Sequence, residues 1–132
     1  MFTRNLDQAE RFTCAGIDFG MLLPRDLTNS VEVVFESLNA GQSTPVDEHA
    51  NFDQVFYILQ GSAEVGIGNE TAEVQSQTVV FVPRKTKHSV RATSPTGVQY
   101  LYINIWGSGV PESEQNWKRV YSIIHDRRIA DQ

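Results

Sequence analysis

Four side chains in the middle of the chain belong to the types that bind metal ions in proteins. Asp47 and His49 follow a turn-rich segment and are two residues apart, so on an extended backbone their side chains lie on one face. Gln54 opens an apolar run that can return antiparallel to that segment, and His88 follows Pro83 later in the chain. Two imidazoles, one carboxylate and one amide could therefore meet inside an antiparallel barrel. The pattern predicts a metal site.

The spacing of these residues resembles the first of the two motifs of the cupin family. That motif runs Gly, five residues, His, one residue, His, three or four residues, Glu, six residues, Gly. With the same spacing, this chain has Gly41, Asp47, His49, Gln54 and Gly61. The first His of the family motif is thus replaced by Asp, and its Glu is replaced by Gln.

The second cupin motif is matched less completely. It runs Gly, five residues, Pro, one residue, Gly, two residues, His, three residues, Asn. The corresponding residues here are Gln77, Pro83, Lys85, His88 and Ala92, so only Pro and His are kept. The resemblance implies an all-β fold: a single-domain cupin β-barrel, also described as a double-stranded β-helix or jelly roll.

The resemblance also implies one divalent metal ion held by Asp47, His49, Gln54 and His88. Two histidines and one carboxylate suit iron(II) in oxygenases and leave coordination positions open. Gln54 could add a neutral oxygen ligand, which is similar to the small cupins that linearise unsaturated uronates during pectin breakdown. The ions considered are Fe²⁺, Mn²⁺, Ni²⁺ and Zn²⁺. The alternative is that the two histidines are hydrogen-bonded barrel residues without metal.

The elements that would position these residues are short strands separated by turns. We predict one domain over residues 1–132, with N-terminal strands over 12–23 and a barrel core over about 31–106. A helix is expected over about 112–127, where apolar residues recur at helical spacing, with a final strand as the competing interpretation.

Two of the predicted strands have a clear alternation. In residues 31–38, Val31, Val33 and Phe35 share one face, and Glu32 and Glu36 share the other, which is typical of a half-buried strand. If Gln54 points into the barrel, Phe56 and Ile58 do too. Three apolar residues are then left outside: Val55, Tyr57 and Leu59. This outer row favours a homodimer, with cover by another part of the chain as the alternative.

Other residues are candidates for the pocket wall. Tyr102 and Asn104 lie on the last predicted strand, and either could relay a proton, so we treat both as catalytic candidates. The candidates for substrate binding are Phe56, Tyr100, Arg84 and Lys85. The two cations precede His88 and could attract an anionic substrate, although such a run is more often a solvated hairpin.

Composition excludes several classes of function. The net charge of -5, without a basic stripe, argues against a nucleic-acid partner, and no segment has the roughly 20 apolar residues needed to span a bilayer. The N-terminus lacks the apolar core of a secretion signal, which predicts a cytoplasmic protein. Cys14 is a lone cysteine, so no internal disulfide is expected.

Three functions remain open at this stage. The first is a metal-dependent enzyme that uses the ion as a Lewis acid on a small, oxygen-rich, anionic metabolite, by isomerase, lyase, decarboxylase or ring-opening chemistry. The second is an iron(II)-dependent dioxygenase with the Asp47, His49 and His88 site. The third is a non-catalytic cupin that binds a small molecule. A fold alone does not decide between them.

Overall fold

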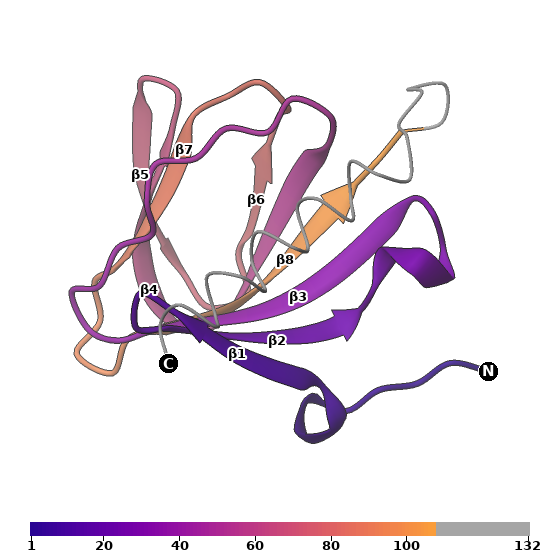
Figure 1. Cartoon of the computed structure of the whole chain (residues 1–132). Coiled ribbons are helices and arrows are strands. Elements are labelled where there is room, and N and C mark those ends of the chain that lie inside the picture. Colours follow the sequence, from indigo (N-terminus) through magenta and orange to yellow (C-terminus); the bar gives the residue numbers. More distant parts are fainter. Residues whose placement is uncertain (108–132) are drawn as a thin grey trace.

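The computed structural model describes residues 1–107, which form an antiparallel β-barrel (Figure 1). Two short 3₁₀ helices, η1 (Leu6–Gln8) and η2 (Arg25–Leu27), accompany eight strands. The strands are β1 (Glu10–Cys14), β2 (Ile17–Leu23), β3 (Val31–Leu38), β4 (Asp53–Ile67), β5 (Glu70–Gln75), β6 (Val79–Val82), β7 (His88–Ala92) and β8 (Val98–Ile105). The all-β prediction is confirmed. The helix expected over 112–127 lies outside the described residues.

One wall of the barrel is the run β1-β2-β3-β8-β4, in which each strand pairs antiparallel with its neighbour. The other wall is formed where β5 and β7 pair with the second half of β4. Strand β4 therefore belongs to both walls, and Figure 1 shows the two walls separating from it. Among residues 1–107, no helix has the length and hydropathy needed to cross a membrane.

Strand β4 is continuous through Gly61. The apolar run that begins after Gln54 is the first half of a single strand of 15 residues. A register shift between Ile58 and Gln60 bends it, and Gly61 has a φ of 85°. A Cβ at Gly61 would lie 2.1 Å from the carbonyl oxygen of Gly97, so only glycine allows this close crossing.

The orientation of β3 differs from the one that alternation predicts. Alternation predicts that the face with Val31, Val33 and Phe35 is buried, yet Glu32 and Glu36 are 4% and 6% exposed. Val34 and Leu38 share the glutamate face and are fully buried, so the polar face of this strand is the one that looks into the barrel. On the other side, Val31 and Val33 are half-buried and Phe35 is buried, so both faces of β3 are largely covered. The barrel interior must therefore accommodate two carboxyl groups.

Apolar side chains close one end of the barrel interior. The core cluster includes Val34, Leu38, Ile58, Ala63, Val65, Val82, Val90, Ala92 and Val98. Burying each of the larger aliphatic side chains contributes about 1.5–3 kcal/mol relative to exposure, so this packed end supplies most of the rigidity. The inward direction predicted for Phe56 and Ile58 on β4 is confirmed, because they are 3% and 0% exposed.

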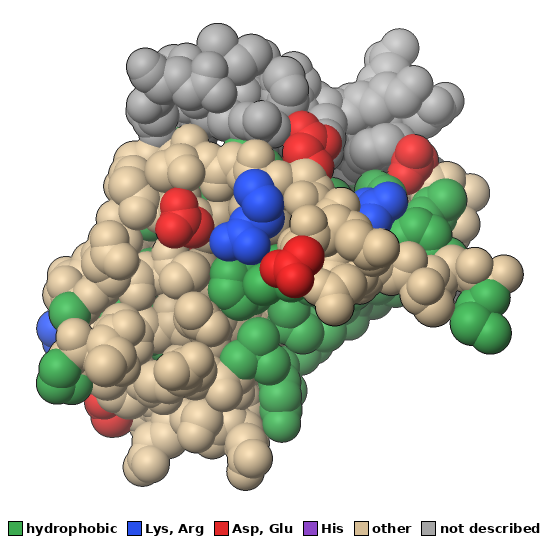
Figure 2. Space-filling model, turned by 90° about the horizontal axis from the view of Figure 1, so that it is seen from below, with side chains coloured by type: hydrophobic (Ala, Val, Ile, Leu, Met, Phe, Trp, Pro, Cys, Tyr) green, Lys and Arg blue, Asp and Glu red, His purple; other side chains and the backbone are tan. Residues whose placement is uncertain are grey.

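The outer face of β4 and β6 is apolar and open to solvent. Tyr57 and Leu59 are 38% and 42% exposed, and Val79 and Phe81 on the paired strand are 64% and 57% exposed. The outward direction predicted for Val55, Tyr57 and Leu59 is thus confirmed for the two residues at the end of that row. Figure 2 shows one face of the molecule on which hydrophobic side chains form a continuous strip beside scattered charges.

Candidate functional site

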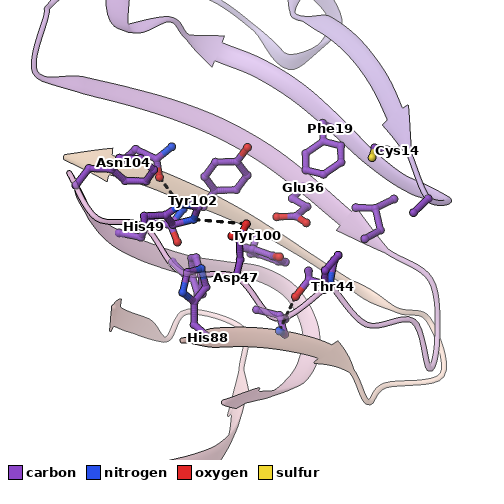
Figure 3. A pocket seen from close by; sticks show the side chains of 17 residues that line it. Cys14, Phe19, Glu36, Thr44, Asp47, His49, His88, Tyr100, Tyr102 and Asn104 are labelled. Carbon is purple, nitrogen blue, oxygen red and sulfur yellow. Dashed lines mark hydrogen bonds and ion pairs between the residues drawn. The ribbon is translucent and has the colours of Figure 1, made fainter. Parts of the chain in front are cut away.

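A cavity of about 260 Å³ occupies the barrel interior beyond the packed end (Figure 3). It is slightly smaller than the roughly 300–1,000 Å³ typical of sites for drug-sized ligands, so it suits a small molecule. Seventeen residues line it: Cys14, Ala15, Ile17, Phe19, Glu36, Thr44, Pro45, Asp47, His49, Phe52, Gln54, Phe56, His88, Val90, Tyr100, Tyr102 and Asn104.

His88 begins β7 and is fixed by hydrogen bonds at its backbone and its ring. The loop before β4 runs beside β7, with the Asp47 amide 3.0 Å from the His88 carbonyl oxygen and the His88 amide 2.9 Å from the Asp47 carbonyl oxygen. The ring Nδ1 lies 3.0 Å from the carbonyl oxygen of Thr86. Since a carbonyl only accepts, Nδ1 carries a proton, and in the neutral ring the lone pair is then on Nε2. This is the arrangement usual for a metal-binding histidine.

His49 lies across from His88 in the same cavity, with 5.1 Å between the ring centroids. Its ring also stacks on Phe52, at 4.5 Å, and Phe52 packs in turn on Trp106. Burial lowers the pKa of His49, and the nearby Asp47 carboxylate opposes that shift while His88 adds to it. The neutral imidazole is thereby favoured, which is the form that binds a metal.

Asp47 stands at the rim of this group. Its Oδ2 is 3.8 Å from Nε2 of His49, and its side chain is 58% exposed. That separation is too long for a hydrogen bond, but it allows both atoms to bond to one ion at about 2.0–2.2 Å each. The two-residue spacing therefore does bring the carboxylate beside the imidazole, in a wetter position than the two rings.

Gln54 ends a buried chain of hydrogen bonds that fixes the direction of its amide. A carboxylate oxygen of Glu32 accepts from Nδ2 of Asn104 at 2.6 Å, so the Asn104 oxygen must face Gln54. That oxygen accepts from Nε2 of Gln54 at 2.7 Å. The remaining atom, Oε1 of Gln54, is buried and has no hydrogen-bond partner among residues 1–107. A buried acceptor of this kind costs about 1–3 kcal/mol unless something binds it.

These observations fit a divalent ion. Within residues 1–107, no three His, Cys, Asp or Glu side chains form a group that could hold a metal by themselves. The Gln54 oxygen lines the same cavity as His49 and His88 and adds a further candidate ligand, with Asp47 at the rim. Two imidazole nitrogens and amide or carboxylate oxygens, with no sulfur, suit the ions between manganese and zinc.

A second polar group lies farther along the cavity, on β3 and β8. Glu36 is opposite Tyr100 in the register of the two strands, and their side chains are hydrogen-bonded. Burial raises the pKa of Glu36 to about 7, although the Tyr100 hydrogen bond favours the ionised form. Burial, with the nearby carboxylates, raises the pKa values of Tyr100 and Tyr102 well above the usual value, so both hydroxyls stay protonated.

A family match covers most of this site. The Cupin domain model matches residues 34–104, more than half of the chain, from the inner face of β3 to Asn104. The chain belongs to the cupin family. The resemblance inferred from the spaced motifs is therefore confirmed, and the described barrel is a cupin barrel.

Sequence relatives of this cupin are distant. It is 31% identical over 81 residues to an uncharacterised protein of Streptomyces coelicolor, a match that spans 61% of this chain and 72% of the relative. It is also 30% identical over 50 residues to an uncharacterised protein of Methanocaldococcus jannaschii, spanning 38% of this chain. The match covers only 40% of the length of that archaeal relative.

Solved structures support the same fold. A predicted oxalate decarboxylase from Thermotoga maritima superposes with a TM-score of 0.72 at 21% identity, covering 81% of this chain and all of the other. KdgF from a Halomonas species gives a TM-score of 0.68 at 20% identity, covering 81% of this chain and 96% of the other. At these identities the likeness concerns the fold.

The candidate residues of this cupin separate into two groups. The cavity is lined by Asp47, His49, Gln54, His88, Phe56, Tyr100, Tyr102 and Asn104. Arg84 and Lys85 are not among the lining residues. The Arg84 amide and Nε both donate to Oδ1 of Asp53, which holds the pKa of that carboxyl below its usual value. Lys85 is exposed, so the structure gives no support to a substrate-binding role for either cation.

The roles expected for Tyr100 and Asn104 also change with the geometry. The Asn104 amide is hydrogen-bonded to Gln54 through its oxygen and to Glu32 through its nitrogen. It therefore orients Gln54 and does not offer these atoms to a substrate. Tyr100 is hydrogen-bonded to Glu36. Sequence reasoning did not single out Glu36 as a cavity residue or Glu32 as the buried partner of Asn104. The available signal was that Val34 and Leu38, on the same strand face, are apolar.

Proposed function

We propose that this cupin is a metal-dependent enzyme that acts on a small, oxygen-rich, anionic metabolite. One divalent ion, Fe²⁺, Mn²⁺, Ni²⁺ or Zn²⁺, would be held by His49, His88 and Gln54, with Asp47 as the charged ligand at the rim. When bound, the ion supplies Lewis-acid chemistry, polarising a carbonyl or carboxylate oxygen of the substrate. Isomerase, lyase, decarboxylase and ring-opening reactions all use that effect.

The observation that carries this proposal is the unpartnered Oε1 of Gln54. Burying an acceptor without a partner is unfavourable, and here the Asn104–Glu32 chain holds the oxygen in that state. A chain of hydrogen bonds that orients a first ligand is the usual support around protein metal sites. Nδ1 of His88 is anchored on a carbonyl in the same manner. Both side chains are thus fixed with their lone pairs free.

The charge distribution favours binding of an anionic substrate only at the proposed metal ion. Among the described residues, no lysine or arginine lines the cavity, whereas Glu36 and Asp47 do. The anionic group would therefore bind at the metal and not at the Arg84 loop. Tyr102 is buried at the cavity wall, and its hydroxyl, kept protonated by the raised pKa, can donate a hydrogen bond to a developing oxyanion.

Metal content tests the first half of the proposal. Protein purified anaerobically and aerobically, then loaded with Mn²⁺ and desalted, should retain close to one ion per chain by elemental analysis. Gln54→Leu should bind Mn²⁺ at least tenfold more weakly, because it removes the buried oxygen. The matched control is Gln60→Leu, an exposed residue on the same strand. Wild-type protein that retains no Mn²⁺ after loading would overturn the proposal.

Solvent exchange tests the second half. Pyruvate is a suitable probe because it is small, anionic and carries a carbonyl beside exchangeable C–H bonds. The Mn²⁺-loaded protein in D₂O should remove the methyl proton signal of pyruvate much faster than the same concentration of free Mn²⁺. A rate equal to that of free Mn²⁺ would contradict an enolising enzyme.

A second candidate is an iron(II)-dependent dioxygenase. It would use the Asp47 carboxylate, whose Oδ2 lies 3.8 Å from Nε2 of His49, together with the two histidines. Because these three side chains do not already form a metal-holding group among residues 1–107, this candidate requires them to move closer together. Oxygen consumption by the Fe²⁺-loaded protein with an organic substrate separates the two candidates. A Lewis-acid enzyme turns over its substrate without consuming oxygen.

We also propose that two copies pair through the outer face of β4 and β6. Tyr57, Leu59, Val79 and Phe81 form an exposed apolar surface there, and such a surface is characteristic of an interface. Light scattering should give about twice the 14.8 kDa of one chain, and Phe81→Asp should shift it towards one chain. A mass of one chain for the wild type at micromolar concentration contradicts pairing. The cytoplasmic location remains a prediction.

A further inference from the structure

The cavity contains a carboxyl group that the metal site does not use. Glu36 projects from β3 into the space between the two ends of the cavity, with Phe19 on one side and Tyr100 on the other (Figure 3). It is 6% exposed, so its carboxyl group is sealed from bulk water on most sides. In Figure 3 the His49 and His88 rings lie at one end, and Cys14 lies at the other.

Within residues 1–107, the wall around Glu36 contains hydrogen-bonding groups but no lysine or arginine. Its facing residue on β2 is Phe19, and on β8 its neighbours are Tyr100 and Tyr102. The other titratable groups that line the cavity are Cys14, Asp47, His49 and His88. A structural carboxylate in such a place is normally paired with a cation. The hydrogen-bond partner of Glu36 is the neutral phenol of Tyr100, so the carboxyl can exist in both protonation states.

We propose that Glu36 is the catalytic acid–base group of this cupin, the residue that removes a proton from the bound substrate and returns it. This inference rests on the proposed function. The carboxylate takes a proton from a carbon next to a carbonyl: the C–H bond breaks, an O–H bond forms on Glu36, and the electron pair enters the C=C bond of an enolate. Glu36 then returns a proton, either the one it took or one exchanged with solvent water while held on the carboxyl group, to a carbon or oxygen of that molecule. No oxidant or reductant is required.

The neighbouring hydroxyl completes the assignment. Tyr100 stays protonated and donates a hydrogen bond to the Glu36 carboxylate. This hydrogen bond stabilises the ionised form of Glu36. A pKa of about 7 gives both forms of Glu36 near neutral pH, which is the condition under which general acid–base catalysis is most effective. The positions of the metal site and of Glu36 indicate the substrate class. The substrate needs an anionic oxygen that reaches the metal site and an acidic C–H bond that faces Glu36. A short 2-oxo or 2-hydroxy acid has both.

The pyruvate exchange assay tests this with Glu36→Gln, which keeps the shape of the side chain but cannot carry the proton. Mn²⁺ content should stay the same, and the exchange rate should fall about 100-fold or more. Glu64→Gln is the matched control, because its carboxylate pairs with Arg91 on the exterior and should leave the rate unchanged. A Glu36→Gln rate within twofold of wild type, at equal Mn²⁺ content, overturns the inference and leaves the proposed function standing.

A direct titration of Glu36 distinguishes an acid–base role from a purely structural effect of the substitution. With glutamate labelled at the side-chain carboxyl carbon, one ¹³C resonance should titrate with a midpoint near 7 and be absent in Glu36→Gln. Tyr100→Phe should move that midpoint upwards, because the lost hydrogen bond favoured the ionised form. A midpoint near the ordinary value of 4.5 overturns the inference. Wild-type protein with no exchange above free Mn²⁺ removes the proposed function, and the inference with it.

Discussion

The two ends of the polar cavity are built on different principles. At the histidine end, the ligand candidates come from three separate segments and are oriented by other groups, through Thr86 for His88 and through Asn104 for Gln54. At the Glu36 wall, one carboxyl and one phenol face each other across the paired strands β3 and β8. The first end has lone pairs fixed in place, and the second has a proton that can move. A metal site needs the former, and acid–base chemistry needs the latter.

The comparison is tested most strongly by removing one imidazole. His88→Ala should lower Mn²⁺ affinity by more than 100-fold, because loss of a supporting group alone typically costs 10–100-fold and here a ligand is lost. Isothermal titration with Mn²⁺ measures it. Ser89→Ala, the next residue along β7, is the control. Retention of wild-type affinity in His88→Ala would remove the histidine end as a metal site.

Glu36→Gln, unlike His88→Ala, should leave Mn²⁺ affinity unchanged and should alter the free energy of unfolding. The pKa of Glu36 is raised from 4.5 to about 7 in the folded protein, so the folded state holds the proton more tightly than the unfolded state. This contribution is fully present below pH 4.5 and is lost as pH rises through about 7. At pH 8 the ionised buried carboxylate should cost on the order of 3 kcal/mol, at 1.36 kcal/mol per pKa unit.

Urea unfolding of both proteins at pH 4 and pH 8 measures that difference. Glu36→Gln should be more stable than wild type at pH 8, and the advantage should disappear at pH 4. An equal difference at the two pH values would show that Glu36 has an ordinary pKa, and the contrast between the two ends would then be wrong.

Asn104→Ser should have a smaller effect, confined to the histidine end. It breaks the link between Glu32 and Gln54, so the Gln54 amide loses its fixed direction. Mn²⁺ affinity should fall about 10–100-fold, and the Glu36 titration should not change. Isothermal titration and the ¹³C resonance report the two parts separately. An unchanged affinity would mean that the hydrogen-bond chain does not orient a ligand.

Asp47→Ala should have the smallest effect of the series. The carboxylate is 58% exposed and lies at the rim, so solvent can replace it. We expect Mn²⁺ affinity to fall by about tenfold, at the low end of the range for groups that support a metal. Asp47→His should keep the metal but reduce exchange of pyruvate. If Asp47→Ala weakens binding as much as His88→Ala does, Asp47 is a full ligand, and the dioxygenase alternative gains.

Much of the histidine end could be predicted from sequence, because spacing carries the information. Asp47 and His49 lie on one side of an extended segment, Gln54 opens the next strand, and His88 occupies the second motif. The alternation of β4 also predicts which side chains point inwards. The Asn104–Glu32 support was not predictable, since it depends on the pairing of β8 with β3 and β4.

The Glu36 wall could not be predicted by the same rules, and the reason is physical. Alternation is read on the assumption that polar faces meet water, which holds where the interior is a packed core. Here part of the interior is a cavity, and Glu36, on the glutamate face of β3, lines it. Local patterns conflict with the global fold most often at functional sites. The mixed face of Glu32, Val34, Glu36 and Leu38 was the sign of such a place.

The most direct test of the central claim is the position of a bound metal. Crystals of the Mn²⁺-loaded protein, measured for the anomalous scattering of manganese, should show one peak in the cavity. The account predicts bonds of about 2.0–2.3 Å from that peak to the His49 and His88 rings and to Oε1 of Gln54. A peak bound to other residues, or no peak in the cavity of fully loaded protein, would contradict it.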